Sequence, residues 1–242
     1  MIMEELKQYK YIIDNFNQIR QRVQNKAEEN YRNPGEILIV AVSKTFPPEA
    51  IKAAKDLGIF IFGENYAQEL REKLQFFADK PNRIEWHFIG HLQTNKVKYL
   101  MPYVQLIHSV DSAELAEEIN KRAILHNKVQ NILMQVNTSG EESKSGVEPE
   151  KAANLAKELL QFPNLNLIGL MTIGTFSDDE RISRKEFSML RNLKNELNKK
   201  LGIDNLCELS MGMSHDYEIA IEEGATIVRI GTAIFGNRNY NK

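Results

Sequence analysis

The sequence is poor in thiols and has no long apolar run. Its one cysteine, Cys207, cannot form an internal disulfide and leaves too few thiols for a cysteine-based zinc site. Cys207 lies in the apolar run LCELSM, which predicts a packed core position. No apolar run approaches the ~18 residues of a membrane span, and Glu4 and Glu5 stand where a signal peptide would need an apolar core. We therefore expect a cytoplasmic protein with no membrane contact.

A strong excess of charge of either sign is also missing. The chain has 31 basic and 33 acidic residues, which give a formal net charge of -2. No global field therefore attracts nucleic acid or an anionic membrane surface, and we expect neither as a partner. An anionic ligand must be held by a local site.

Two patterns of apolar residues divide the chain. Residues 3–32 are polar with apolar positions at spacings of three and four, which predicts a long amphipathic helix. From residue 37 on, short β-branched runs alternate with helical patterns, as in a parallel sheet built from βαβ units. The expected strands are 37–43, 59–64, 84–90, 106–110, 131–137, 167–173, 207–213 and 226–232. The expected helices between them are 48–57, 66–77, 112–126, 150–161, 180–200 and 216–223.

The number and order of these units indicate the fold class. Eight alternating units in about 200 residues favour a closed (β/α)8 TIM barrel over an open doubly wound sheet. A barrel of this kind uses nearly all of the 242 residues, so we expect one α/β domain, residues 1–242, with an extra N-terminal helix. The residues just past each strand then lie on the carboxyl face, where such barrels build their sites.

Lys44 directly follows the first expected strand. A lysine in this position can pair with an anion as a point charge, or its amine can attack a carbonyl to form an imine. It can also be a surface lysine that extends from the barrel rim. The residue alone does not choose among these three roles.

The end of the chain adds features of a phosphate site. The stretch GATIVRIGTAIFG places Gly231 and Thr232 after the eighth strand, and Ser214 follows the seventh. Barrels of this class often bind phosphate in these two loops, through backbone N–H groups and hydroxyls. In a closed barrel, strand one adjoins strand eight, so Lys44 would lie beside the phosphate. Together these residues indicate a phosphorylated aldehyde as the ligand.

Arg229 precedes Gly231 by two residues and so shares its side of the strand. It could point at the ring of a ligand that is anchored by its phosphate. Because arginine stays protonated, it would keep a facing pyridine nitrogen unprotonated and make the ring a weaker electron sink. The alternative is a structural salt bridge across the barrel.

Six separated motifs agree in order and spacing with one known family. They are AVSKTFP, FGENYAQE, WHFIGHLQTNK, NTSGEESKSG, GLMTIG and LSMGMSHDYEIAIEEGATIVRIGTAIFG. Together they resemble the pyridoxal phosphate homeostasis proteins, small barrels similar to the barrel domain of bacterial alanine racemases. The resemblance runs from about Ile37 to Gly236.

This resemblance implies roles for individual residues. Lys44 would form a Schiff base with pyridoxal 5′-phosphate, and Asn65 would line the ring side of the pocket. Arg229 would face the pyridine nitrogen. Lys144 falls on a family lysine near the cofactor, although an ordinary solvated loop lysine fits equally well. The phosphate would be held by Ser214, Gly231 and Thr232.

The histidines do not suggest a metal site. His87 and His91 are four residues apart across a strand end rather than on one helical face, so we expect no metal there. His91 fits better as a hydrogen-bonding residue of the pocket wall. His108 and His126 form no recognisable constellation.

The resemblance implies a protein that stores, buffers or delivers pyridoxal 5′-phosphate without substantial turnover. Apo forms of enzymes that use this cofactor would be the recipients, and we expect a monomer. A weak amino acid racemase is the alternative. It needs a second acid/base group opposite the lysine. In alanine racemases this group is a tyrosine from a separate β domain. Here the chain ends at Lys242, so we expect no such domain. Tyr66 is the one local tyrosine near a strand end that could substitute, although its place at a helix start also fits a packing role. A class I aldolase would explain Lys44 and a phosphate site but not a ring-facing Arg229.

Overall fold

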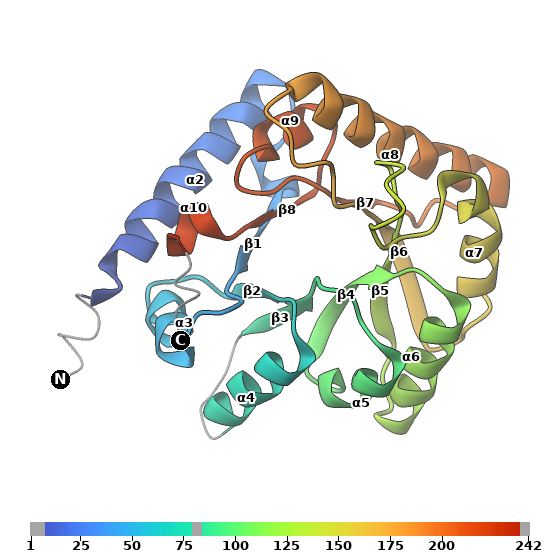
Figure 1. The fold of residues 1–242 in the computed structure, drawn as a ribbon, viewed down its shortest axis with the longest axis horizontal. Coiled ribbons are helices and arrows are strands. Elements are labelled where there is room, and N and C mark those ends of the chain that lie inside the picture. The colour runs from blue at the N-terminus through green and yellow to red at the C-terminus, as the bar shows by residue number, and fades with distance from the viewer. Residues whose placement is uncertain (1–7, 79–83, 238–242) are drawn as a thin grey trace.

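The structure is a computed structural model that describes residues 8–78 and 84–237. Its eight strands form one closed barrel in chain order, with every neighbouring pair parallel (Figure 1). The predicted barrel is confirmed, and the open sheet is excluded. The strands are β1 (Leu38–Val42), β2 (Ile61–Glu64), β3 (Glu85–Phe88), β4 (Val104–Val110), β5 (Gln130–Gln135), β6 (Leu165–Met171), β7 (Glu208–Ser210) and β8 (Ile227–Ile230).

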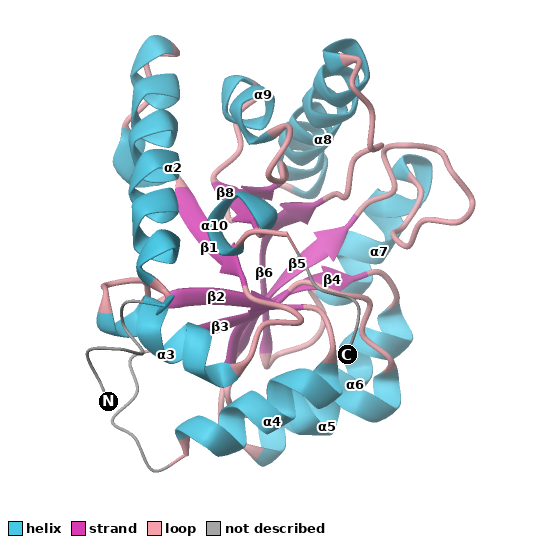
Figure 2. Ribbon diagram, turned by 60° about the vertical axis from the view of Figure 1, so that its left-hand side comes forward, coloured by secondary structure: helices cyan, strands magenta, loops and turns pink. Residues whose placement is uncertain are grey.

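Helices follow the strands and surround the barrel (Figure 2). The long helices lie close to their predicted ranges, whereas the one-turn helices α5 and α10 were not predicted as helices. The helices are α2 (Lys10–Glu29), α3 (Pro48–Asp56), α4 (Ala67–Phe77), α5 (Val97–Leu100), α6 (Ala113–Leu125), α7 (Ala152–Leu159), α8 (Glu180–Leu201), α9 (Tyr217–Glu222) and α10 (Thr232–Phe235). Short 3₁₀ turns occupy Pro34–Glu36, Thr94–Lys96 and Pro149–Lys151.

The strands are buried on both faces, which explains their nearly continuous apolar runs. Alternate side chains of a strand point to opposite faces. In β1, Val40 packs into the barrel interior, and Ala41 packs against the surrounding helices. The interior cluster consists of Val40, Leu106, Leu133, Met171 and Ile227, each from a different strand.

Helix α2 packs against the last part of the barrel. Its buried residues Ile12, Ile19, Val23 and Ala27 form one face, as the periodicity predicted. The Tyr11 hydroxyl donates to the Phe235 carbonyl at 3.2 Å, and the Asn15 amide donates to the Ile234 carbonyl at 3.0 Å. Figure 1 shows α2 beside α10. The helix was predicted for 3–32, of which 3–7 lies outside the described residues.

Strand β7 is shorter than the predicted 207–213. Gly212 leaves the sheet with a φ of +89°, and a Cβ there would lie 2.5 Å from the Ala220 Cβ. The chain therefore turns towards α9 at a point that only glycine fits. Cys207 precedes β7 and is exposed, with its Sγ 3.4 Å from the Asp204 carbonyl, so its predicted core position is wrong. Its backbone N–H still donates to the Ile168 carbonyl at 2.8 Å, but Cys207 stands at the amino end of the strand, where its side chain lines an open hollow.

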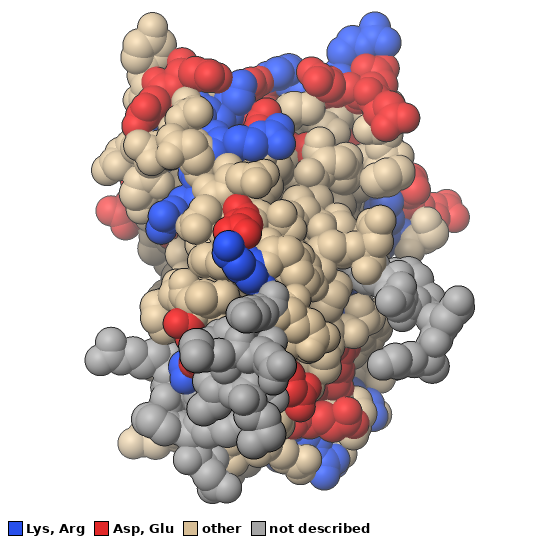
Figure 3. Space-filling model, turned by 90° about the vertical axis from the view of Figure 1, so that its left-hand side faces the viewer, with Lys and Arg blue, Asp and Glu red and all other residues tan. Residues whose placement is uncertain are grey.

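The surface fits the balanced composition. Figure 3 shows one face on which basic and acidic side chains are interspersed around a broad uncharged area. Among the described residues, no helix is both long enough and apolar enough to span a membrane.

Candidate functional site

A hollow of about 330 Å³ lies at the carboxyl ends of β1, β2 and β8. It gathers six of the seven residues predicted for the site from four separate parts of the chain. These six are Lys44, Asn65, Ser214, Arg229, Gly231 and Thr232. Side chains that the sequence did not assign to the site complete the lining: Val42, Ile89, Ile173, Phe176, Met213 and His215.

Lys44 enters the hollow from a position two residues past the end of β1. Val40, Val42 and Lys44 share one side of the chain by alternation. Val42 and Lys44 both line the hollow. Strand β1 pairs with β8 in a register that places Val40 opposite Arg229. The predicted proximity of the first and eighth strands is therefore confirmed.

Backbone donors surround Ser214. Its hydroxyl oxygen accepts hydrogen bonds from the N–H groups of Gly231 at 3.2 Å and Ala233 at 3.3 Å. These N–H groups lie where β8 passes into α10, and Thr232 follows Gly231 directly. Two N–H donors and two hydroxyls thus converge at one end of the hollow. Such a group suits an anion with several acceptor oxygens.

Arg229 lies at the inner end of the hollow and is 4% exposed. Its Nη1 donates to the Ser210 Oγ at 2.6 Å, and its Nη2 donates to the Thr172 carbonyl at 2.7 Å. Burial lowers the pKa of its guanidinium to about 10. It therefore remains a cation and a pure donor at neutral pH. The alternative of a salt bridge is not supported, because the ion pairs between described residues do not include Arg229.

A chain of hydrogen bonds extends from Arg229 through the barrel. The Ser210 Oγ lies 2.8 Å from His108 Nδ1, and His108 Nε2 lies 3.0 Å from His87 Nδ1. Burial lowers the pKa of His87 to about 4 and that of His108 well below its usual value, so both rings are neutral at pH 7. The expectation that His108 belongs to no constellation is wrong.

Only the first bond of this chain has a fixed direction. Arg229 can only donate, so the Ser210 oxygen accepts from it. The hydroxyl keeps a second lone pair and its own proton, so the directions of the bonds to His108 and on to His87 follow the tautomers of the two rings. Sequence analysis could have noted inward-facing polar residues in β3, β4 and β7. It could not have shown that their side chains meet.

Lys144 is not among the residues that line the hollow. Its ammonium donates to Glu141 Oε1 at 2.6 Å and to the Gly174 carbonyl at 3.3 Å. Gly174 follows Ile173, a lining residue, so Lys144 is bound next to the part of the wall that Ile173 forms.

Two aromatic rings lie at the mouth. Phe176 is 80% exposed, and its ring centroid is 4.8 Å from that of His215. The His215 Nε2 lies 3.2 Å from the buried Asp216 carboxylate. Sequence analysis assigned neither residue to the site. Phe176 lies in the loop between β6 and α8, away from the strand end, whereas His215 directly follows Ser214 in the motif GMSHD and could have been found there.

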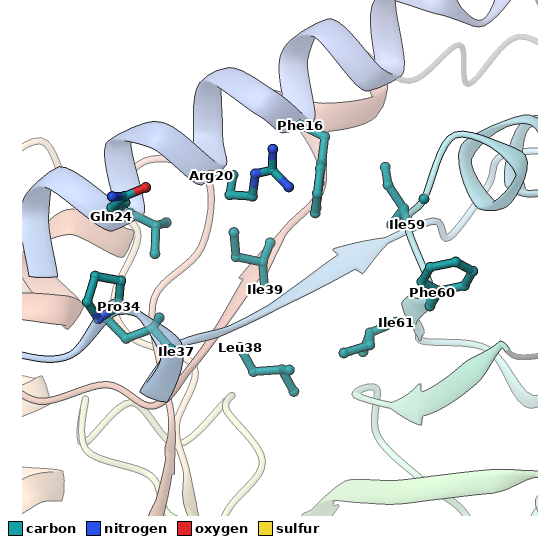
Figure 4. Close-up of a pocket in the computed structure, with 13 residues that line it drawn as sticks. Phe16, Arg20, Gln24, Pro34, Ile37, Leu38, Ile39, Ile59, Phe60 and Ile61 are labelled. Atoms are coloured by element: carbon teal, nitrogen blue, oxygen red, sulfur yellow. The ribbon is translucent and has the colours of Figure 1, made fainter.

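Two other hollows have no lysine amine among the described residues that form their walls. An apolar one of about 420 Å³ lies outside the barrel between α2 and the β1–β2 edge, with Arg20 as its single charged lining residue (Figure 4). A larger one of about 740 Å³ lies at the opposite end of the barrel, where His87 faces it. No cluster of three or more His, Cys, Asp or Glu fit to hold a metal occurs within residues 8–78 and 84–237.

Comparison with known proteins places the chain in a family. The model of the alanine racemase N-terminal domain matches residues 10–239. The pyridoxal phosphate homeostasis protein of Aquifex aeolicus (strain VF5) is 47% identical over 227 residues, which are 94% of this chain and 98% of the relative.

Two solved structures are similar over nearly their whole lengths. An unknown protein from Bifidobacterium adolescentis has a TM-score of 0.87 and 38% identity, covering 94% of this chain and 95% of its own. PipY of Synechococcus elongatus PCC7942, solved with PLP bound, has a TM-score of 0.82 and 32% identity, covering 93% and 100%. The chain therefore belongs to the alanine racemase N-terminal domain family and, within it, to the pyridoxal phosphate homeostasis proteins.

Proposed function

We propose that this protein binds pyridoxal 5′-phosphate as a Schiff base on Lys44 and stores, buffers or delivers it without substantial turnover. One observation carries the proposal: the Lys44 side chain and the donors around Ser214 line the same hollow of about 330 Å³. An amine suits an aldehyde, and converging N–H and hydroxyl groups suit a phosphate. The PLP-bound structure of the similar PipY supports the same ligand.

The other residues of the hollow fit the remaining parts of this ligand. The aldehyde of the bound cofactor would supply the carbon that the Lys44 amine attacks. Gly231, Thr232 and Ser214 would hold the phosphate, and Asn65 would line the ring. Arg229 would donate towards the pyridine nitrogen, because the two bonds described above use two of its five N–H donors.

The electrostatics of Arg229 favour storage over turnover. A pyridine nitrogen that faces a permanent donor stays unprotonated, so the ring withdraws electrons less strongly. Racemisation also needs acid/base groups on both faces of the substrate α-carbon. Besides Lys44 and Arg229, His215 is the one ionisable side chain among the described residues that line the hollow. It directly follows Ser214, at the proposed phosphate end.

The proposal extends to the setting of the protein. Residues 1–242 would act as one cytoplasmic, monomeric domain, and apo forms of PLP-dependent enzymes would receive the cofactor. Lys144 would act as an alternative or transient amine near the cofactor, after release from its Glu141 partner.

Borohydride trapping followed by peptide mass spectrometry tests the covalent site. We expect a reduced pyridoxyl group on Lys44 in the wild-type protein and none in Lys44→Ala, with Lys144→Ala as the matched lysine control. Both variants should keep the far-ultraviolet circular dichroism of the wild type, because a lysine at the barrel mouth adds little to the core. A label on Lys144 alone, or none, would refute the proposal.

Two assays test delivery of the cofactor and the absence of turnover. The loaded protein is mixed with an apo PLP-dependent enzyme, and recovered activity reports transfer. The same protein is incubated with L-alanine, and D-alanine is measured by chiral chromatography. Rapid D-alanine formation that is lost in His215→Ala would replace the storage role by a racemase.

A further inference from the structure

Three charged residues lie beneath Lys44, outside the hollow. Lys73 of α4 is 1% exposed, and its ammonium lies 2.6 Å from Glu64 Oε1 and 2.6 Å from Glu69 Oε1. Glu64, at the end of β2, is fully buried, and Glu69 is partly buried. None of the three lines the hollow.

This cluster holds the backbone on both sides of Lys44. The Lys73 ammonium donates to the Ser43 carbonyl at 2.9 Å. The Thr45 N–H donates to Glu69 Oε1 at 2.6 Å. The peptide group before Lys44 is thus bound by the cation, and the peptide group after it by the anion. The Ser43 hydroxyl adds a bond of 2.6 Å to Glu64 Oε1.

The backbone at this point needs such support. Thr45 has a φ of 70°, in the left-handed region that a β-branched residue rarely adopts. Conformations of this kind persist only where surrounding contacts impose them, and they cluster at functional sites. The Glu69 carboxylate is the contact that receives the Thr45 N–H.

The cluster is a costly way to gain stability. Burying charged groups removes their hydration, and an apolar replacement is often equally stable. The cost is visible at Glu64: burial raises the pKa of its carboxyl to about 7, although Lys73 and Ser43 oppose the shift. The Glu64 Oε2 also has no hydrogen-bond partner among the described residues. A role in placing Lys44 explains why the chain tolerates this cost.

We propose that Glu69 and Lys73, with Glu64 beneath them, are positioning residues that fix the Lys44 backbone so that its amine reaches the ligand aldehyde. The inference rests on the proposed function, since it concerns the same lysine. It assigns a role to three residues that never touch the ligand.

Comparing the affinities for two ligands distinguishes the positioning of Lys44 from a general stabilisation of the pocket. Pyridoxal 5′-phosphate can form the bond to Lys44, whereas pyridoxine 5′-phosphate has the same ring and phosphate but no aldehyde. The ratio of their dissociation constants measures the contribution of the covalent bond. In Glu69→Ala, we expect this ratio to shrink about tenfold, because a charge-assisted hydrogen bond to the Thr45 N–H is lost. The affinity for pyridoxine 5′-phosphate should stay unchanged.

Glu72→Ala is the matched control. Glu72 lies on the same helix and is exposed, and its Oε1 accepts a hydrogen bond from the Gln68 side chain at 3.1 Å, one turn away on α4. It should leave both affinities unchanged. An unchanged ratio in Glu69→Ala, or an equal loss for both ligands, would overturn the inference.

The same measurement distinguishes the inference from the function on which it rests. A wild-type protein that binds both ligands equally would overturn the Schiff base itself, whereas a wild-type preference that survives in Glu69→Ala would overturn only the positioning role. If Glu69→Ala does not fold, Glu69→Gln carries the test. Its amide oxygen can still accept from Thr45 without the charge, so we expect a smaller loss, and an unchanged ratio would count against the inference.

Discussion

The Arg229 guanidinium donates to the Ser210 hydroxyl at 2.6 Å inside the barrel. The two residues come from neighbouring strands, β8 and β7, and both are buried. Because arginine has no acceptor, the serine oxygen accepts in this bond, and the same hydroxyl lies 2.8 Å from His108 Nδ1. Ser210 thereby links the cation at the inner end of the hollow to the buried histidines of the barrel interior.

Replacing Ser210 should test this dependence. In Ser210→Ala, both Arg229 Nη1 and His108 Nδ1 lose a buried partner, so we expect a loss of about 1–3 kcal/mol in the free energy of unfolding. Urea denaturation followed by circular dichroism measures it. Ser188→Ala removes a hydroxyl that bonds to the Lys185 carbonyl on the partly exposed side of α8, and should cost little. Equal losses in the two variants would contradict the buried network.

The buried histidines predict a pH dependence of stability. The pKa of His87 falls from 6.5 to about 4 in the folded protein, so the unfolded chain binds more protons between these values. The part of the unfolding free energy that depends on a neutral His87 is therefore fully present above about pH 6.5. It is lost as the pH falls towards 4, and the loss amounts to at most about 3 kcal/mol. His108 shifts in the same direction.

Comparison with His87→Asn measures the effect of the His87–His108 pair, because His108 contacts His87 and its pKa depends on that ring. Glu64 titrates in the opposite sense, because its raised pKa favours the folded state at low pH, but it is present in both proteins and cancels. The difference in unfolding free energy between wild type and variant, from urea titrations at several pH values, should grow from pH 4 to 6.5. A flat difference would mean that His87 titrates normally in the folded protein.

Gly212 should be irreplaceable where the chain turns towards Ser214. An alanine there would have a φ of +89° and a Cβ 2.5 Å from Ala220, so we expect a loss of stability above the ~1–3 kcal/mol of backbone strain alone. Affinity for pyridoxine 5′-phosphate should also fall, because Ser214 moves. Affinity is measured by calorimetry.

Gly202 provides the control for Gly212. It has a φ of +65°, and no described atom outside its chain neighbours lies within 4 Å of the position that an alanine Cβ would occupy. Gly202→Ala should therefore show the strain without the clash and leave ligand affinity intact. Similar affinities in the two alanine variants would argue against the role of the Gly212 turn.

Much of the fold could be predicted from local sequence patterns. The alternation of short apolar runs with amphipathic helices depends on near neighbours in the chain, and it led to the correct barrel and to Lys44 at a strand end. Strand ends were less accurate where pairing decides them, as at β7. Cys207 was misplaced because its apolar neighbours in the chain do not show that it lies at the open amino end of the barrel.

The candidate site, too, could be predicted from the sequence only in part. Lys44, Ser214 and Arg229 could be selected from the sequence because strand ends and motifs mark them. Lys144 was selected on the same basis, but it pairs with Glu141 and is not among the residues that line the hollow. The bonds from Arg229 to β7 and from Lys73 to the Lys44 backbone join side chains far apart in the chain. Such contacts depend on which strands and helices adjoin and on the rotamers that burial allows, and only the folded protein decides these.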